Sequence, residues 1–195
     1  MGTEAFKDVV WQCKAWSELD RETTYALLRL RAEVFVVEQD CPYQDLDNKD
    51  CKGVHLWAER AALPAGEGGA VLALTRLLPA GTSYPEEVSI GRVVTSSDVR
   101  GTGMGRELMR QSLLALDRIW PGEPIRLSAQ SYLERFYSDF GFKAQGEQYL
   151  EDGIPHVAMT RPAGRPRVPL SSPSAIIFAV DVRHPLCFCG HSLPE

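Results

Sequence analysis

This 195-residue sequence lacks several features that mark common classes of protein. No stretch approaches the run of about 18 apolar residues that a membrane-spanning helix requires, so we expect no membrane association. The opening stretch MGTEAFKDVVWQCKAW has no apolar core of the kind found in signal peptides. The net charge of -5 comes with no basic block. Nucleic acid is therefore not an expected partner, because phosphate binding requires a basic face.

Cysteine is also sparse. The five cysteines are odd in number and widely scattered, which does not suggest a disulfide framework. The group Cys187, Cys189 and His191 matches no common structural zinc site, and it offers no obvious fourth ligand. We therefore predict a cytoplasmic protein with reduced thiols and no bound metal.

The hydrophobic pattern, in contrast, is clear along most of the chain. Predicted strands cover residues 9–16, 54–61, 70–78, 88–95, 125–129, 142–149 and 155–160, and predicted helices cover 23–37, 104–119 and 131–140. Thr23 or Thr24 is expected to cap the first helix. The order β-α-β-β-β-α-β-α-β-β predicts an α/β (α+β) fold in which helices flank a mixed sheet.

The composition changes at Pro162, since six of the 13 prolines lie in the last 34 residues. We expect residues 1–161 to form one domain and residues 162–195 to be an appended, poorly ordered tail. Within that tail, residues 175–180 (AIIFAV) could form one strand.

The most informative stretch is GRVVTSSDVRGTGMGRELMRQSLLAL, residues 91–116, where a predicted strand passes into a predicted helix. Gly101, Gly103 and Gly105 let backbone N–H groups converge. The helix N-terminus adds about half a positive charge, and Arg100 can add a side-chain contact. A diphosphate is thus a natural ligand, although a simple connecting turn explains the spacing equally well. No Lys-Ser/Thr pair follows, which excludes a Walker loop, and the glycines do not form GxGxxG.

Arg-Gly-x-Gly-x-Gly after GRVVTSSDV resembles motif A of the GCN5-related N-acetyltransferases (GNAT), Gln/Arg-x-x-Gly-x-Gly/Ala. The family's next landmark is a strand followed by a helix with a tyrosine just before Gly-Phe, which IRLSAQSYLERFYSDFGF (125–142) matches. LRAEVFVVEQDCPYQDLD (30–47) and YLEDGIPHVAMTR (149–161) are similar to the ElaA-type branch. The resemblance covers about residues 6–161. It implies the GNAT fold, a mixed and mostly antiparallel sheet whose strands 88–95 and 125–129 splay apart.

The resemblance further implies acetyl-CoA as co-substrate, with its diphosphate on the motif A amides and its pantetheine arm paired along strand 88–95. An amide near Val93 or Val94 would then donate to the thioester carbonyl. Gln130 stands where the family often has asparagine. The residues assigned to the cofactor are Val93, Val94, Thr95, Arg100, Gly101, Thr102, Gly103, Met104, Gly105, Arg106 and Gln130.

The implied reaction is direct attack by a primary amine in a ternary complex. Such an amine has a pKa of about 10, so a base must take a proton from it. Tyr137 matches the family's usual acid, which protonates the leaving thiolate; alternatively, it is an amphipathic helix residue with its hydroxyl at the surface. Candidate bases are Glu38, His55 and His156, with Glu33 ranked behind them. Glu38 would act either with a pKa raised by partial burial or through a water molecule. A salt-bridged Glu38 and purely structural histidines are the alternatives. If Glu38 is the base, Glu38→Gln should lower turnover more than cofactor binding.

The acceptor is expected at the acidic loop EQDCPYQDLDNKDCKG, residues 38–53. The residues assigned to acceptor binding are Glu33, Gln39, Tyr43 and Asp45. The loop is either an acidic mouth that attracts a cationic amine or simply a solvated loop. Lys49 occupies a ligand position of the calcium-loop pattern, so this loop is not expected to bind calcium.

We therefore expect an N-acetyltransferase that acts on a small-molecule or peptide amine, and a homodimer is compatible with the sequence. A non-catalytic acyl-CoA-binding module is one alternative. An acyltransferase like the acyl-homoserine lactone synthases is another, since these also have an R…VF…E segment near the N-terminus.

Overall fold

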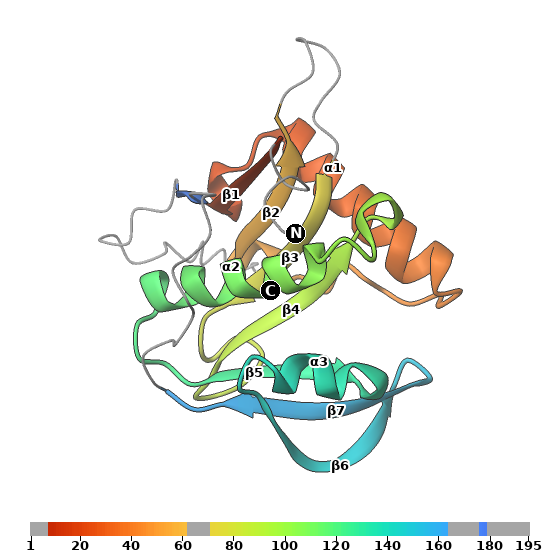
Figure 1. Ribbon diagram of the computed structural model, residues 1–195, viewed down its shortest axis with the longest axis vertical. Helices are drawn as coiled ribbons and strands as arrows, with labels where there is room; N and C mark the ends of the chain where they lie inside the picture. Colours follow the sequence, from red (N-terminus) through yellow and green to blue (C-terminus); the bar gives the residue numbers. More distant parts are fainter. Residues whose placement is uncertain (1–7, 62–70, 164–175, 179–195) are drawn as a thin grey trace, which may run out of the picture.

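The computed structural model describes residues 8–61, 71–163 and 176–178, which form one mixed sheet with helices on both faces (Figure 1). The strands are β1 (Val9–Ala15), β2 (Val54–Arg60), β3 (Val71–Leu78), β4 (Val88–Thr95), β5 (Ile125–Gln130), β6 (Lys143–Glu151), β7 (Ile154–Arg161) and β8 (Ile176–Phe178), in the spatial order β6-β7-β5-β4-β3-β2-β1-β8. The α-helices are α1 (Arg21–Arg31), α2 (Met104–Ile119) and α3 (Glu134–Ser138). The β4–β5 and β1–β8 pairs are parallel and the other pairs are antiparallel, which confirms the predicted fold class.

The first helix differs from its prediction at both ends. It begins at Arg21 because Asp20 is the cap, with its side chain accepting a hydrogen bond of 2.7 Å from the Thr23 backbone N–H. The predicted caps, Thr23 and Thr24, are therefore wrong. At its other end α1 widens into a π-helical segment, Ala32–Glu38, which leads directly to the predicted acceptor loop.

Two hydrophobic layers hold the helices against opposite faces of the sheet. Successive residues of a strand point to opposite faces, and adjacent Leu56 and Trp57 accordingly belong to different clusters. Leu56 packs with residues of α2, whereas Trp57 packs with Leu27 and Leu30 of α1. Figure 1 shows α2 lying across the sheet over β2 to β4. No helix in the described parts of the chain is long and apolar enough to cross a membrane.

Part of the predicted tail joins the sheet. Residues 176–178 pair in parallel with β1, in the register Trp11 to Ile176, and fall within the strand expected at 175–180. Residues 164–175 and 179–195, including the Cys187, Cys189 and His191 group, lie outside the described residues. The division of the chain at residue 161 stays a prediction.

Strands β4 and β5 pair only where they begin, through Val88 with Ile125 and Ser89 with Arg126. Farther along, β4 carries a bulge: Leu74 of β3 faces Val94, but Arg76 faces Gly91, so β4 has one extra residue. Within the bulge Arg92 has a φ of 53°, in the left-handed region. Because a bulge bends its strand and increases the local twist, β4 turns away from β5 beyond Ser89. This confirms the predicted splay.

Candidate active site

A cleft of about 840 Å³ lies where β4 and β5 separate. The π-helical segment, the loop after it, β4, β5 and the β6–β7 hairpin all contribute to its walls. The predicted site residues that line it are Glu38, Gln39, Tyr43, Val93, Val94, Thr95, Arg100, Gln130, Tyr137 and His156. Those outside its lining are Glu33, Asp45, His55 and residues 101–106.

The glycine-rich turn beside the cleft presents free backbone donors. Gly101 and Gly103 have φ values of 76° and 92°, and Gly103 caps the 16-residue helix α2. Within the described chain, the amides of Gly101, Gly103, Met104 and Gly105 have no hydrogen-bond acceptor. A Cβ on Gly103 or Gly105 would meet no atom within 4 Å, so the space beside these amides is open. The turn therefore suits an anion at the positive end of a helix dipole.

The side chains of this turn contribute less than its backbone. Met104 is 1% exposed and belongs to the core cluster, so its side chain does not face a ligand. The Thr102 hydroxyl donates to the Val99 carbonyl at 2.6 Å, and the Arg106 guanidinium pairs with Asp139 at 2.9 Å.

Arg100 is engaged with Glu38 across the cleft. Its guanidinium donates to both carboxylate oxygens of Glu38, at 2.8 Å for Nη2 to Oε2, and to the Thr95 carbonyl at 3.2 Å. The hydrogen bond and charge of Arg100 lower the pKa of Glu38 below its usual value. From the sequence, partial burial was expected to raise this pKa instead. Because the Glu38 side chain is 45% exposed, desolvation is small and the arginine dominates.

Tyr137 reaches the cleft from α3. Its residue is 6% exposed, and its ring packs edge-on against Phe136 and Phe142, with centroid distances of 5.1 and 6.2 Å. Burial, with a smaller contribution from Tyr132, raises the pKa of Tyr137 well above its ordinary value. The phenol therefore stays protonated at neutral pH. The alternative of a surface hydroxyl does not describe this buried residue.

The two candidate histidines lie in different environments. His55 is 2% exposed, its Nε2 lies 3.2 Å from the Asp50 carbonyl, and burial lowers its pKa to about 4. It lies outside the cleft lining, so the assignment of His55 as a base is corrected: it is a buried neutral side chain of the fold. His156 lines the cleft opposite Gln130, and its ring stacks on Tyr149.

The hydrogen bonding of His156 defines its tautomer. Its Nδ1 lies 2.8 Å from the Ile154 carbonyl oxygen, which can only accept. The proton is therefore assigned to Nδ1, which leaves Nε2 as the basic nitrogen of the neutral ring. This is the arrangement that a general base in the cleft needs.

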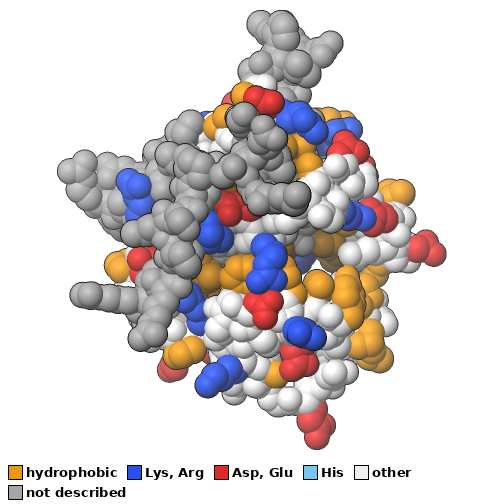
Figure 2. All heavy atoms as spheres, in the orientation of Figure 1, with side chains coloured by type: hydrophobic (Ala, Val, Ile, Leu, Met, Phe, Trp, Pro, Cys, Tyr) orange, Lys and Arg blue, Asp and Glu red, His pale blue; other side chains and the backbone are white. Residues whose placement is uncertain are grey.

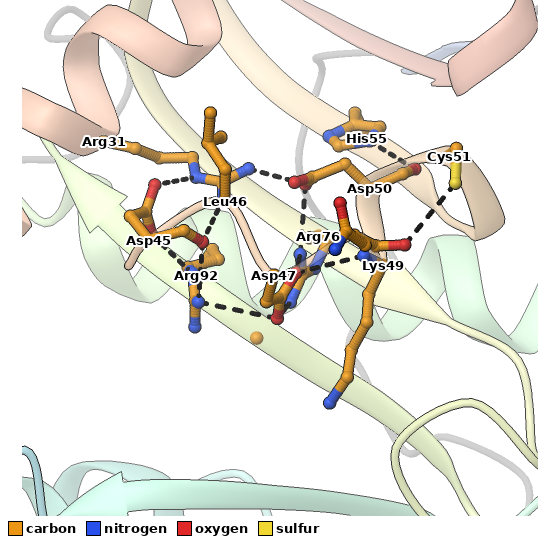
Figure 3. Close-up of polar contacts among 12 residues, drawn as sticks. Arg31, Asp45, Leu46, Asp47, Lys49, Asp50, Cys51, His55, Arg76 and Arg92 are labelled. Atoms are coloured by element: carbon orange, nitrogen blue, oxygen red, sulfur yellow. Dashed lines mark hydrogen bonds and ion pairs between the residues drawn. The ribbon is translucent and has the colours of Figure 1, made fainter. Parts of the chain in front are cut away.

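The acidic loop is neutralised by arginines, as Figure 3 shows. The network consists of Asp45, Asp47 and Asp50 with Arg31, Arg76 and Arg92. Arg31 is 1% exposed, and it binds Asp45 at 2.9 Å and Asp50 at 2.6 Å. The predicted acidic mouth is therefore wrong for these three carboxylates. Asp45 in particular is buried in an ion pair and is not available to an amine.

A second polar group in the cleft, Ser128 with Tyr149 and Glu151, was not predicted from the sequence. The Ser128 hydroxyl donates to Glu151 at 2.7 Å, so the 2.6 Å contact between Ser128 and Tyr149 is donated by the Tyr149 hydroxyl. Both Ser128 and Glu151 line the cleft. The two residues lie in separate strands, and nothing in the sequence pattern indicated that their side chains would meet.

The described surface seen in Figure 2 carries acidic and basic side chains intermixed, and no region of it has basic side chains alone. Within residues 8–61, 71–163 and 176–178, no group of three or more His, Cys, Asp or Glu side chains could hold a metal ion.

Comparison with known proteins identifies the family. The model of the acetyltransferase (GNAT) domain matches residues 55–162. The chain belongs to the GNAT acetyltransferase family. It is 41% identical to the protein ElaA of Escherichia coli over 153 residues, which cover 78% of this chain and 96% of ElaA. The ElaA crystal structure superposes with a TM-score of 0.70 at 40% identity, covering 78% of this chain and 99% of ElaA.

Two further structures share this GNAT fold. An acyl-CoA N-acyltransferase from Pseudomonas aeruginosa has a TM-score of 0.72 at 46% identity, covering 78% of this chain and 99% of its own. A CoA-dependent acyl-homoserine lactone synthase has a TM-score of 0.67 at 18% identity, covering 87% of this chain and 93% of its own. The second likeness concerns the fold alone.

Proposed function

We propose that this GNAT protein transfers an acetyl group from acetyl-CoA to a primary amine by direct attack in a ternary complex. One observation carries the proposal: a single cleft is lined by the free part of β4, by Arg100 of the glycine turn, by the protonated Tyr137 and by His156. These residues would serve as a donor site, an acid and a base around one space.

The donor side would be formed mainly by backbone. The free amides of Gly101, Gly103, Met104 and Gly105 would hold the diphosphate, and the unpaired edge of β4 at Val93 and Thr95 would hold the pantetheine arm. When bound, acetyl-CoA supplies the activated acyl group. An amide at Val93 or Val94 would stabilise negative charge on the carbonyl oxygen as the amine attacks.

Within the cleft, Nε2 of His156 would take the proton from the attacking amine. We prefer His156 to Glu38, because Glu38 is paired with Arg100 and its pKa is lowered, which makes it a weaker base. Tyr137 would donate a hydrogen bond and then a proton to the sulfur of the leaving thiolate. Its raised pKa means that the phenol carries a proton at neutral pH.

The acceptor would be a small-molecule or peptide amine entering between Tyr43 and the β6–β7 hairpin, near Gln39. We place the reaction in the cytoplasm, since Cys13, Cys41 and Cys51 are free thiols and such thiols persist in a reducing compartment.

The test is steady-state release of CoA from acetyl-CoA with a panel of primary amines, monitored with a thiol reagent. We expect turnover with at least one amine and a loss of about 100-fold or more in kcat for His156→Gln. Binding of acetyl-CoA without turnover on any amine would instead support a non-catalytic acyl-CoA module. If acetyl-CoA fails to bind the folded protein at millimolar concentration, the proposal is wrong.

A further inference from the structure

Arg92 occupies an unusual position in the cleft wall. It is the residue of the β4 bulge with a φ of 53°, and it directly precedes Val93 and Val94. A residue other than glycine adopts a left-handed φ at a cost in free energy, and such a conformation persists only where the surrounding contacts hold it. The side chain of Arg92 makes several such contacts.

These contacts come from the loop that follows the π-helical segment. Nε of Arg92 lies 2.7 Å from Oδ1 of Asp45 in an ion pair that lacks hydrogen-bond geometry. Nη2 donates to the Asp45 carbonyl oxygen at 3.0 Å and lies 3.5 Å from Oδ2 of Asp47. The guanidinium also lies over the ring of Tyr43, 5.7 Å from its centroid. Figure 3 shows Arg92 directed from β4 towards Asp45 and Asp47.

The carboxylates that hold Arg92 are themselves fixed from the other side. Oδ2 of Asp45 accepts from Nε of Arg31 at 2.9 Å, and the two carboxylate oxygens of Asp47 accept from Arg76 at 2.6 and 2.7 Å. Arg31 and Arg76 are 1% and 3% exposed. Asp45 thus bridges a fully buried arginine and the arginine of the bulge, so the position of Arg92 is tied to the core.

We propose that Arg92 is a positioning residue for acyl transfer: its side chain, held by Asp45 and Asp47, keeps the β4 bulge in the shape that directs the amides of Val93 and Val94 towards the thioester carbonyl. This inference rests on the proposed function. Without the side-chain contacts, residue 92 relaxes to an extended conformation, and the amides after it turn away from the cleft. The glycine turn at residues 101–105 stays in place, so donor binding is largely kept.

The test compares kcat and the KM for acetyl-CoA in Arg92→Ala and Arg92→Gly. Removal of one oxyanion donor costs about 100- to 1,000-fold in kcat, so we expect Arg92→Ala to lower kcat about 100-fold with KM within about threefold. Glycine adopts a positive φ without side-chain contacts, so the kcat of Arg92→Gly should be about tenfold higher than that of Arg92→Ala. A purely structural role for the side chain would not produce this recovery.

A matched pair of aspartates supplies the control. Asp45 and Asp50 both bind Arg31, and both side chains are 9% exposed, but only Asp45 binds Arg92. Asp45→Asn should lower kcat as Arg92→Ala does, and the double variant should be no slower than either single variant. Asp50→Asn should lose stability in urea unfolding but keep kcat within about threefold. If Asp45→Asn does not fold, the comparison of Arg92→Ala with Arg92→Gly still tests the proposal.

Two results would overturn the proposal: Arg92→Ala with kcat within about threefold of the parent, or equal kcat losses in Asp45→Asn and Asp50→Asn. Either result, obtained with an active parent protein, contradicts the role of Arg92 alone. A parent protein that releases no CoA with any amine contradicts the proposed function first, and this inference with it.

Discussion

Replacement of Tyr137 by phenylalanine should affect stability and activity in opposite directions. No hydrogen bond joins the Tyr137 hydroxyl to another described residue, and its ring keeps all its aromatic contacts in the variant. Loss of the hydroxyl removes the desolvation cost of a buried phenol without breaking a hydrogen bond, so the free energy of unfolding should be unchanged or about 1 kcal/mol higher. Loss of a general acid should lower kcat about 100-fold, which corresponds to about 2.7 kcal/mol of transition-state stabilisation.

Urea unfolding and initial rates of CoA release measure the two effects on the same protein sample. Tyr132→Phe is the control, because Tyr132 also lines the cleft but is 75% exposed and donates its hydroxyl hydrogen to Gln130 at 2.6 Å. Its kcat should stay within about threefold of the parent. The acid role of Tyr137 is refuted if both variants lose kcat equally. A loss of more than about 2 kcal/mol of stability in Tyr137→Phe would show that the hydroxyl has a structural partner.

Three further predictions concern the turn, the buried histidine and the ion pair. Gly103→Ala should lower the free energy of unfolding by about 1–2 kcal/mol and weaken acetyl-CoA binding, because Gly103 has a φ of 92°. Gly105→Ala should raise the free energy of unfolding by about 0.5–1 kcal/mol and bind acetyl-CoA normally. Urea unfolding and calorimetry measure both variants, and equal effects would contradict the assigned turn geometry. Burial lowers the pKa of His55 from 6.5 to about 4, so the unfolded chain takes up a proton first as pH falls. The free energy of unfolding should therefore decline by about 3 kcal/mol between pH 6.5 and 4. Urea titrations at several pH values should show that His55→Gln removes this pH dependence. An unchanged dependence in the variant would contradict a buried, neutral His55. Glu38→Gln frees Arg100 for the diphosphate, so calorimetry should show acetyl-CoA binding about two- to fivefold tighter. The kcat of this variant should be nearly unchanged. A kcat loss above about 100-fold would instead identify Glu38 as the base.

The fold was predictable because its signals are local. The bounds of β4 and α2 agree with the residue ranges expected from the hydrophobic pattern and the glycine turn. The π-helical segment Ala32–Glu38 was not predicted, since its apolar residues also satisfy ordinary helical spacing. The 131–140 helix was predicted too long: the chain forms a 3-10 turn first, and α3 covers only Glu134–Ser138.

The site was predictable only in part, because its charges pair over long distances in the sequence. Asp45 binds Arg31 and Arg92, which are 14 and 47 positions away. The aspartates stand together in one loop and are easily seen, whereas their partners are dispersed. One signal was available: Arg76 and Arg92 interrupt strands that are otherwise apolar or small, and a charge at such a position must find a partner when the strand is buried.

The opening between β4 and β5 follows from the parallel β4–α2–β5 unit. In such a unit the N-terminus of the helix lies near the carboxyl end of the preceding strand, where open α/β sheets bind ligands. A straight β4 would continue to pair with β5 past Ser89 and leave no free edge beside that helix terminus. The bulge at Arg92 ends the pairing midway, so β4 offers a free edge and leads into the turn at residues 100–105. The ion pairs that hold Arg92 therefore belong to the construction of the donor site as much as to the stability of the loop.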